Sequence, residues 1–212
     1  PAGGYAHSLG LESYCADGLV TGPDGVLAFV TSHLEGSAGP CDATAASAAL
    51  AAAARGDMDA CAELDRVLDA MKPARELREA SRQMGRQTLR VGAALTGDPR
   101  LAAHRDAVEG GALPGHHAVA FGVTGGVLGW EREAAATALL YSTSASLVGA
   151  ALRLCRMGQL DGQRVLWALG PVISRLAAEA ARRDADDLWS FAPGIEIRSM
   201  RHAALDARLF RS

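Results

Sequence analysis

The segment from residue 110 to residue 152 constrains the fold most, because it carries almost no charge. Glu131, Arg132 and Glu133 are the only charged residues among its 43 positions. Its second half, residues 134–152, is an uncharged run of 19 residues, which is long enough to span a bilayer. Alanines and hydroxyl-bearing residues make up much of that run, so its hydrophobicity is low. We therefore predict a buried helical hairpin in a soluble core.

The first half of this segment is rich in glycine, with Gly122, Gly125, Gly126 and Gly129. Glycines four residues apart on a helix let a second helix approach closely. Each glycine inside a helix costs about 1 kcal/mol relative to alanine, so tight helix–helix or subunit packing is expected to offset that cost. The spacing is not that of a dinucleotide-binding loop, and no strand precedes it.

The rest of the chain favours helices as well, since it contains 44 alanines, few aromatic residues and no strand-like alternation. Start and stop residues predict where the helices lie. In the N-terminal part they predict a stretch from Ser8 as N-cap to a stop at Gly18, a helix beginning at Pro23, and helices opened by Asp42 and by Asp57. Farther along they predict longer helices over 73–95 and 161–183, and a short helix over 199–207 after a break at Pro193-Gly194. We predict an all-α, single-domain bundle of about nine or ten helices over residues 1–189, followed by a polar C-terminal tail over residues 190–212.

Lysine is almost absent, which excludes several classes of enzyme. Lys72 is the single lysine, and no glycine-rich loop precedes it, so the chain is not a P-loop nucleotidase. The net charge of −3 gives no electrostatic reason to expect nucleic acid binding. Any basic contact surface is therefore built from the 20 arginines, whose planar guanidinium groups suit bidentate pairing with carboxylates.

Cysteine and histidine residues do not form a recognisable metal or catalytic motif. The four cysteines include no C-x-x-C pair, and we predict that they are reduced, cytosolic and mostly buried. His116 and His117 form the densest imidazole pair, but neighbours on a helix point about 100° apart, so capping or an interface contact is favoured over a shared metal. A helical protein without visible catalytic residues is predicted to be a binding or assembly protein.

Five motifs in order resemble the UreF family of urease accessory proteins. The N-terminal residues 1–12, PAGGYAHSLGLE, are similar to the family's N-terminal motif, and Ser199-Met-Arg-His202, followed by Leu205 and residues 208–212, is similar to its C-terminal signature. Between them, residues 77–85, 115–122 and 161–163 resemble the family's Arg–Ser–Gln–Gly helix, its histidine-containing helix start and its Gly-Gln turn. The resemblance covers nearly the whole chain.

The resemblance implies an all-α protein that is not an enzyme. A UreF-type protein is a cytoplasmic scaffold that binds a UreD/UreH-type accessory protein and recruits a UreG-type GTPase, so that nickel is inserted into apo-urease. It also implies a homodimer, for which the glycine- and serine-rich hairpin is a reasonable contact. No cofactor of its own is implied, although nickel passes through the complex, and neither nucleic acid nor a membrane is an expected partner.

The resemblance also indicates which residues contact partners. These are Tyr5, His7, Arg78, Arg82, Met200, Arg201, His202, Leu205, Arg208, Leu209 and Phe210. Tyr5 combines apolar area with a hydroxyl, as interface anchors do, and Arg208 is suited to pair with carboxylates on a partner. The competing interpretation is structural, with Tyr5 and His7 forming a capped helix start and the arginines solvated. Asp206 departs from the tyrosine usual in the family, which implies a looser tail or a more basic partner.

Two other functions remain open at this level. The chain is a regulator of the GTPase if it supplies an arginine, with Arg208 the first choice, to GTP hydrolysis in trans. It is an unrelated all-α regulator if the motifs are coincidental. Direct nickel binding is also open, with His7, His116, His117, Cys61 and the acidic residues as candidate ligands.

Overall fold

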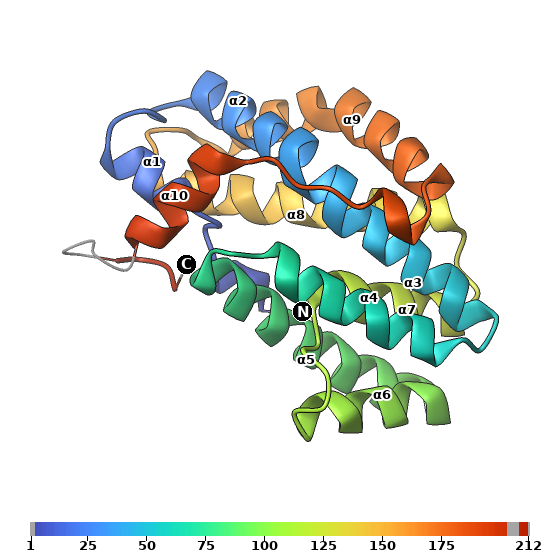
Figure 1. Ribbon diagram of the computed structural model, residues 1–212. Helices are drawn as coiled ribbons and strands as arrows, with labels where there is room; N and C mark the ends of the chain where they lie inside the picture. Colours follow the sequence, from blue (N-terminus) through green and yellow to red (C-terminus); the bar gives the residue numbers. More distant parts are fainter. Residues whose placement is uncertain (1–2, 203–207, 212) are drawn as a thin grey trace.

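The chain folds into a bundle of helices (Figure 1). Its buried apolar side chains form two clusters. The computed structural model describes residues 3–202 and 208–211. In that part of the chain there are ten α-helices and no strand, which confirms the predicted all-α bundle. The helices are α1 (Leu11–Ala16), α2 (Pro23–His33), α3 (Thr44–Ala54), α4 (Met58–Met71), α5 (Arg75–Thr96), α6 (Pro99–Glu109), α7 (His117–Val127), α8 (Arg132–Leu154), α9 (Gln159–Arg182) and α10 (Pro193–His202). Short 3₁₀ turns cover Gly4–Ala6 and Ala185–Asp187, and a π-helical segment covers Leu34–Ala43.

Local capping signals place several helix ends where the sequence predicts them. Asp57 is the N-cap of α4, and its carboxylate accepts a hydrogen bond of 3.0 Å from the Ala60 amide. Pro23 is the first residue of α2, where its missing N–H costs nothing. Gly18 follows α1 with a φ of +69°, a left-handed conformation that suits glycine.

Two predicted helix starts are wrong. Ser8 is not an N-cap, because α1 begins at Leu11 after Gly10. Asp42 does not open a helix either, because α2 continues through the π-helical segment into α3. Pro40 in that segment has no N–H for regular α-helical bonding. The Gly36 carbonyl accepts a hydrogen bond of 2.7 Å from the Phe191 amide, so a distant part of the chain bonds to this segment.

The C-terminal helix also differs from the prediction. Pro193-Gly194 does not break the chain before a helix over 199–207, because Pro193 is the first residue of α10, a position that proline favours. The described part of α10 runs to His202, and the rest of the predicted helix, residues 203–207, lies outside the described part of the chain. Ile195 and Ser199 are buried, so α10 packs on the bundle (Figure 1).

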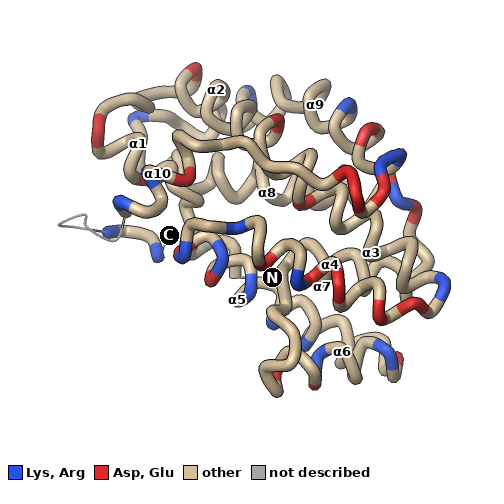
Figure 2. The backbone as a smooth tube through the Cα atoms, in the orientation of Figure 1, with Lys and Arg blue, Asp and Glu red and all other residues tan. Residues whose placement is uncertain are grey.

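The uncharged segment is buried along most of α7 and on one side of α8, but it is not a hairpin of two helices packed on each other. Helix α7 packs chiefly on α3, whereas α8 packs chiefly on α9. The two helices therefore belong mainly to different clusters, α7 with α3 and α4, and α8 with α2 and α9. In Figure 2 the stretch of α8 between Glu133 and Arg153 carries no charged colour, as its central place in the fold requires.

Two of the helical glycines explain how α7 approaches α3 so closely. A Cβ atom on Gly122 would lie 2.2 Å from the Ala46 carbonyl oxygen, and one on Gly126 would lie 2.5 Å from the Leu50 oxygen. Both distances are far inside van der Waals contact, so the packing that was predicted to offset the glycine cost is confirmed. Gly129 has a different role, because it lies beyond the end of α7 with a φ of +71°.

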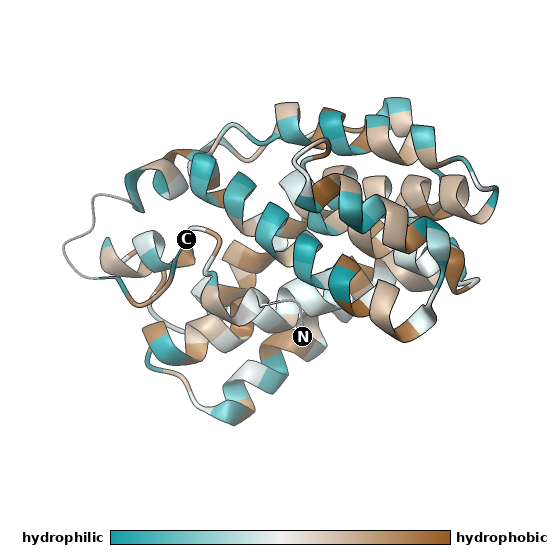
Figure 3. Ribbon diagram, turned by 90° about the horizontal axis from the view of Figure 1, so that it is seen from below, coloured by the Kyte–Doolittle hydropathy of each residue, from teal (hydrophilic) through white to brown (hydrophobic). Residues whose placement is uncertain are grey.

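Helix α8 is long and apolar enough to cross a membrane by length and composition alone. Half of its most apolar 18-residue window is nevertheless buried inside the fold. Leu140 and Leu147 are fully buried in the apolar cluster that α8 shares with α9. Figure 3 shows hydrophobic and hydrophilic residues alternating along the helices, as expected when each helix has one apolar side. The apolar character of α8 is thus used in the protein core.

We expect Gly122→Ala to lower the free energy of unfolding by about 3 kcal/mol, because the added methyl group overlaps the α3 backbone. Thermal unfolding followed by circular dichroism would then show a fall in Tm of about 6–12 °C for a chain of this size. Gly149→Ala is the matched control, since a Cβ there meets nothing within 4 Å and alanine favours a helix. Equal stabilities of the two variants would contradict this account of the α3–α7 contact.

Candidate functional site

The two ends of the chain meet beside α5. The Arg211 amide donates a hydrogen bond of 2.9 Å to the Ala6 carbonyl, and the marks for both termini lie near α5 in Figure 1. A Cβ atom on Gly4 would lie 3.4 Å from the Met84 sulfur of α5, so the N-terminal turn packs against that helix. The two terminal motifs singled out in the sequence therefore form one site.

The carboxylate of Glu12, on α1, is the centre of this site. Its Oε1 atom accepts a hydrogen bond of 2.6 Å from the Leu209 amide. Its Oε2 atom accepts one of 3.1 Å from the Phe210 amide and lies 2.8 Å from Nε2 of His202. Glu12 is only 6% exposed, so one buried carboxylate holds the end of the chain through two backbone amides and one side chain.

His202 lies between two carboxylates and is fully buried. Its Nδ1 atom is 2.8 Å from Glu76 Oε2 on α5, opposite the contact of Nε2 with Glu12. A neutral imidazole has a single N–H, so serving both carboxylates requires an imidazolium or a proton on one carboxyl group. Arg208 adds a longer contact, with NH1 at 3.5 Å from Glu76 Oε1. We call Glu12, Glu76, His202, Arg208 and Phe210 the terminal cluster.

Neighbouring contacts attach α10 and the tail to α1 and α8. The Ser13 hydroxyl donates a hydrogen bond of 3.1 Å to the Arg198 carbonyl, and the Arg198 guanidinium lies 4.5 Å from the centre of the Tyr14 ring. On the other side, the Arg153 guanidinium of α8 lies 4.0 Å from the centre of the buried Phe210 ring. Such cation–π contacts are strongest when the partners are shielded from water.

Charge, hydrogen bonds and burial shift the pKa values of Glu12 and His7 in this region. Burial alone would raise the pKa of Glu12, but hydrogen bonds from His202, Leu209 and Phe210 outweigh it and hold this pKa below its ordinary value. Burial, together with the positive charge of Arg211, lowers the pKa of His7. Glu12 is therefore an ionised acceptor at neutral pH, while His7 is a neutral imidazole.

The terminal cluster includes only part of the predicted site. His202, Arg208 and Phe210 belong to it, and the Leu209 amide bonds to Glu12. Met200 and Arg201 face solvent on α10, whereas His7 is buried nearby. Tyr5 lies in the first 3₁₀ turn, but its side chain, like Leu205, is outside the described part of the chain.

Sequence reasoning missed Glu12 and Glu76. Glu12 is the last residue of the N-terminal motif, and Glu76 lies in the helix predicted over residues 73–95, but neither was predicted to be a site residue. A buried histidine in the C-terminal motif needs hydrogen-bond acceptors, and this need is a signal that points to the carboxylate in the other motif.

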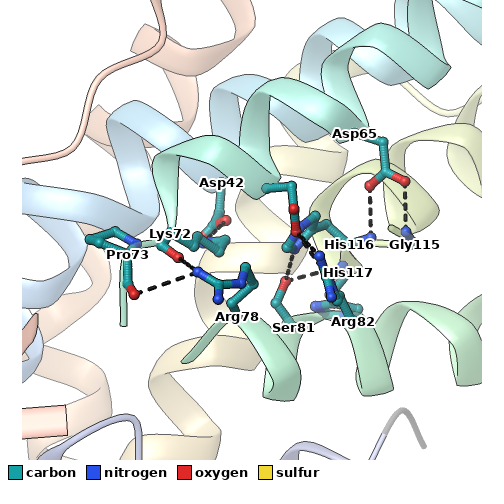
Figure 4. A network of polar contacts seen from close by, with 11 residues as sticks. Asp42, Asp65, Lys72, Pro73, Arg78, Ser81, Arg82, Gly115, His116 and His117 are labelled. Atoms are coloured by element: carbon teal, nitrogen blue, oxygen red, sulfur yellow. Dashed lines mark hydrogen bonds and ion pairs between the residues drawn. The ribbon is translucent and has the colours of Figure 1, made fainter. Parts of the chain in front are cut away.

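Arg78 and Arg82 belong to a different polar network, between α4, α5 and α7 (Figure 4). Arg78 donates a hydrogen bond of 2.7 Å to the Lys72 carbonyl at the end of α4. Arg82 contacts Asp69 Oδ1 through Nε at 2.9 Å and NH2 at 2.5 Å. Both arginines are partly buried and engaged within the chain, and their predicted contact with a partner stays a prediction.

His116 is the buried centre of that second network. Burial lowers the pKa of His116 to about 4 even though Asp69 opposes this, so its ring is neutral at neutral pH. Asp69 is ionised, because hydrogen bonds from His116 and Arg82 outweigh its burial and lower its pKa. His116 Nε2 therefore donates to Asp69 at 3.0 Å, and Nδ1 accepts from the Ser81 hydroxyl at 3.0 Å. The ring connects α7 to α4 and α5, which is a structural role.

The backbone at the start of α7 is fixed by a second carboxylate. Asp65, which is fully buried on α4, accepts hydrogen bonds of 2.6 Å from the Gly115 amide and 2.7 Å from the His116 amide (Figure 4). A Cβ atom on Gly85 of α5 would lie 2.0 Å from the Gly115 oxygen, so only glycine fits there. The sequence predicted that the histidine pair caps a helix or lies at an interface. In the structure His116 is the N-cap residue of α7, and its backbone amide bonds to Asp65.

A cavity of about 80 Å³ lies beside this network, between the π-helical segment, α5, α8 and α10. Lys72 and Asp42 form an ion pair of 2.8 Å at its wall, and His33 and His117 also line it. Burial lowers the pKa of each histidine to about 4, so both rings are neutral. The volume has room for several water molecules, since one needs about 10–15 Å³.

The candidate nickel ligands are not gathered into one centre. Within residues 3–202 and 208–211, no three His, Cys, Asp or Glu side chains come together in a way that would hold a metal ion. Cys61 is buried on α4, where its thiol faces the Ala49 carbonyl of α3 at 3.5 Å. His116 is committed to Ser81 and Asp69. In the described structure these residues have separate roles.

The fold and the site define an all-α helical bundle whose two terminal motifs meet in one cluster of buried carboxylates and a histidine. Comparison with known proteins identifies the family. The UreF family model matches residues 20–170, about seven-tenths of the chain. The chain is also similar along its full length to proteins named urease accessory protein UreF. It is 38% identical to the one from Paenarthrobacter aurescens (strain TC1), 35% to that from Arthrobacter sp. (strain FB24) and 31% to that from Corynebacterium glutamicum (strain R), and each match covers 92% of the relative.

The chain therefore belongs to the UreF family of urease accessory proteins. The predicted resemblance is confirmed, and the third alternative, an unrelated all-α regulator, is excluded. These relatives are named as accessory proteins and not as enzymes.

We expect Glu12→Gln to lower the free energy of unfolding by about 3 kcal/mol at neutral pH, because it removes the buried charge that faces His202. The pKa of Glu12 in the folded chain lies below its ordinary value of 4.5. Its stabilising effect is thus complete above that value and is lost as the pH falls through the folded pKa. Urea denaturation of both proteins at neutral and acid pH measures this, and the difference between them should shrink in acid.

Glu63→Gln is the matched control, since Glu63 is 68% exposed and pairs with Arg66 on the surface of α4. Its effect should stay below about 0.5 kcal/mol at any pH. A Glu12→Gln protein as stable as this control would show that the terminal cluster does not hold the tail.

Proposed function

We propose that this chain is a cytoplasmic, non-enzymatic scaffold for urease maturation. In this proposal it binds a UreD/UreH-type accessory protein and recruits a UreG-type GTPase, and the assembly inserts nickel into apo-urease. Nickel is the cargo of the complex, and the chain needs no cofactor of its own. Membership in the family supports a part in urease maturation, and the surface beside the terminal cluster supports the binding of a partner.

The observation that carries this proposal is the set of exposed apolar side chains on α10 and the tail, the two segments that the buried terminal cluster holds. Ile197 and Met200 on α10 are 49% and 53% exposed, and Leu209 in the tail is 58% exposed. Arg201 and Arg208 are exposed in the same two segments. Apolar side chains combined with arginines are typical of the centres of protein interfaces. The cluster underneath fixes the backbone, so this surface is already ordered for a partner.

Because one face of α10 is buried, variants that test the scaffold proposal must leave this helix in place. Removing everything after Pro193 would also remove Ile195 and His202, which are buried against the bundle. A truncation after His202 keeps α10, and a Met200→Asp substitution keeps the whole chain. The truncation also removes Phe210, which is buried in an apolar cluster, so Met200→Asp is the variant that changes the proposed surface while the core of the bundle remains intact.

We expect both variants to lose co-purification with the UreD/UreH-type protein while keeping their helical circular dichroism signal. A charge at Met200 would be buried without a counter-charge in the complex. Leu95→Asp is the matched control, because Leu95 is 81% exposed at the far end of α5 and should tolerate the charge. Variants that still assemble and activate urease would exclude this surface as the contact.

The alternative function, regulation of the GTPase, is supported by the position of Arg208. Its side chain is 44% exposed, and within residues 3–202 and 208–211 its polar contact is with Glu76 at a long 3.5 Å, which supports its ability to reach a partner. If it enters the GTPase site in trans, Arg208→Ala should reduce GTP hydrolysis about a thousandfold or more within an assembled complex. Measuring hydrolysis with the purified complex tests this, and Arg201→Ala is the control. An unchanged rate would leave the scaffold as the sole proposal.

We place the implied homodimer contact on the outer side of α8 and α9. A groove of about 330 Å³ lies there, lined by Tyr141, Leu166, Trp167 and Gly170 among others. Trp167 is 88% exposed and Tyr141 is 53% exposed. None of the groove residues is charged, so two copies can meet face to face across a twofold axis without repulsion. The glycines of α7 are already used against α3, which leaves α8 as the relevant half of the predicted hairpin.

We expect Trp167→Asp to convert the dimer to a monomer, because it places a charge in the centre of the apolar contact. Light scattering on a sizing column measures the mass directly. Leu95→Asp again serves as the control and should remain dimeric. A Trp167→Asp protein with the dimer mass would place the contact elsewhere.

A further inference from the structure

Two cysteines that neither the terminal cluster nor the proposed partner surface uses lie against each other. The Sγ atoms of Cys15 and Cys155 are 3.3 Å apart, although 140 residues separate them along the chain. Cys15 is near the end of α1, and Cys155 directly follows α8. Both are free thiols and both are half-buried. This contact was not anticipated, since no short motif pairs the two residues.

We propose that Cys15 and Cys155 form a redox modification site, at which a small-molecule disulfide converts the two thiols into an intramolecular disulfide that ties α1 to the end of α8. The disulfide itself does not depend on the proposed function. Its effect on partner binding does, because that effect acts through the tail.

The geometry favours closure of this bond. Disulfide sulfurs are bonded at about 2.05 Å, so the two atoms need to approach by only about 1.2 Å. Cys155 has an extended backbone outside the helix, and Cys15 is one residue from the end of α1. Both residues can therefore adjust without disturbing the interior of a helix. Half-burial leaves a path for a small oxidant to reach the pair.

The reaction is a balanced thiol–disulfide exchange. The thiolate of one cysteine attacks a small disulfide such as oxidised glutathione, which forms a mixed disulfide and releases one small thiol. The second cysteine, as its thiolate, then attacks the protein sulfur of the mixed disulfide and releases the second small thiol. Two protein thiols lose two hydrogens in total, and the small disulfide is reduced to two thiols. An excess of reduced small thiol reverses both steps.

The position of the pair indicates what the bond changes. Cys15 lies one helical turn after Glu12, the carboxylate that holds the tail. Cys155 lies two residues after Arg153, whose guanidinium covers Phe210. A disulfide therefore joins the two elements on which the tail rests. The oxidised chain is expected to hold its tail more firmly than the reduced chain.

The other two cysteines provide matched controls. Cys41 and Cys61 are 1% and 0% exposed, whereas Cys15 and Cys155 are half-buried. Burial raises the pKa of Cys15 as well as those of Cys41 and Cys61, so the pair differs from the controls in its exposure and in the contact of its two sulfurs. Cys41 and Cys61 lie in a different apolar cluster from the one that Cys15 and Cys155 contact. Replacement of either by alanine keeps a small apolar side chain and leaves the proposed pair intact.

The test uses the purified full chain, treated with oxidised glutathione or with a reducing agent. We expect the oxidised wild type to lose two of its four titratable thiols and to fall in intact mass by two hydrogens. Its Tm should rise by roughly 5–15 °C, since the bond closes a long loop. Cys15→Ala and Cys155→Ala should each abolish all three changes, and Cys41→Ala and Cys61→Ala should retain them. A wild type that keeps four thiols, or that stops at the glutathione adduct, would overturn the proposal.

A second readout tests the effect on the tail without any partner. Trypsin cleaves after arginine, and cleavage after Arg201 or Arg208 releases the tail, which intact mass detects. We expect this cleavage to slow several-fold in the oxidised wild type and to stay unchanged in Cys155→Ala. A disulfide that forms without slowing the cleavage would refute the connection to the tail. Because neither measurement involves another protein, failure here is separate from failure of the scaffold proposal.

Discussion

The close approach of α7 to α3 is the contact on which the rest of the structure depends. Gly122 and Gly126 bring the two backbones together, and this fixes where α7 begins. At that point the Gly115 and His116 amides bond to Asp65 of α4, while the His116 ring bonds to Ser81 of α5. The position of α5 is thereby set, and α5 carries Glu76 to the terminal cluster. The close α3–α7 contact is therefore linked, through the start of α7 and through α5, to the carboxylate of Glu76 in the terminal cluster.

The two polar networks solve the same physical problem in the same way. Asp65 and Glu12 are both buried carboxylates, and each accepts hydrogen bonds from two consecutive backbone amides of a segment distant in sequence. Such charge-assisted bonds are stronger than neutral ones and fix the segment without a regular helix. In both networks a fully buried histidine adds the contact to α5. The inner network holds the start of α7, whereas the outer one holds the chain end, which any partner on that surface would meet.

Local signals in the sequence predicted the features that are determined locally. Asp57 and Pro23 start helices because capping needs only a few neighbouring residues. The predictions for Asp42 and Pro193 were wrong because the structure around them depends on distant contacts. The amides of residues 189 and 191 bond to carbonyls of the π-helical segment, and no local pattern shows this. The same reasoning applies to the site. The resemblance to a family identified His202 and Arg208. The carboxylate partners of His202 are Glu12 and Glu76, which lie 190 and 126 residues away along the chain, and only the folded structure shows that they meet it.

Helix α8 physically connects the surfaces on which the proposals rest. Its middle presents Tyr141 to the groove beside Trp167, and its end places Arg153 over Phe210 and Cys155 against Cys15. Between these points it is packed along α9, with Leu140 and Leu147 fully buried. A helix held so tightly moves as a unit, because a dense core resists local distortion. Any shift of α8 caused by contact with a second copy would therefore reach Phe210 in the tail, where the accessory partner is proposed to bind.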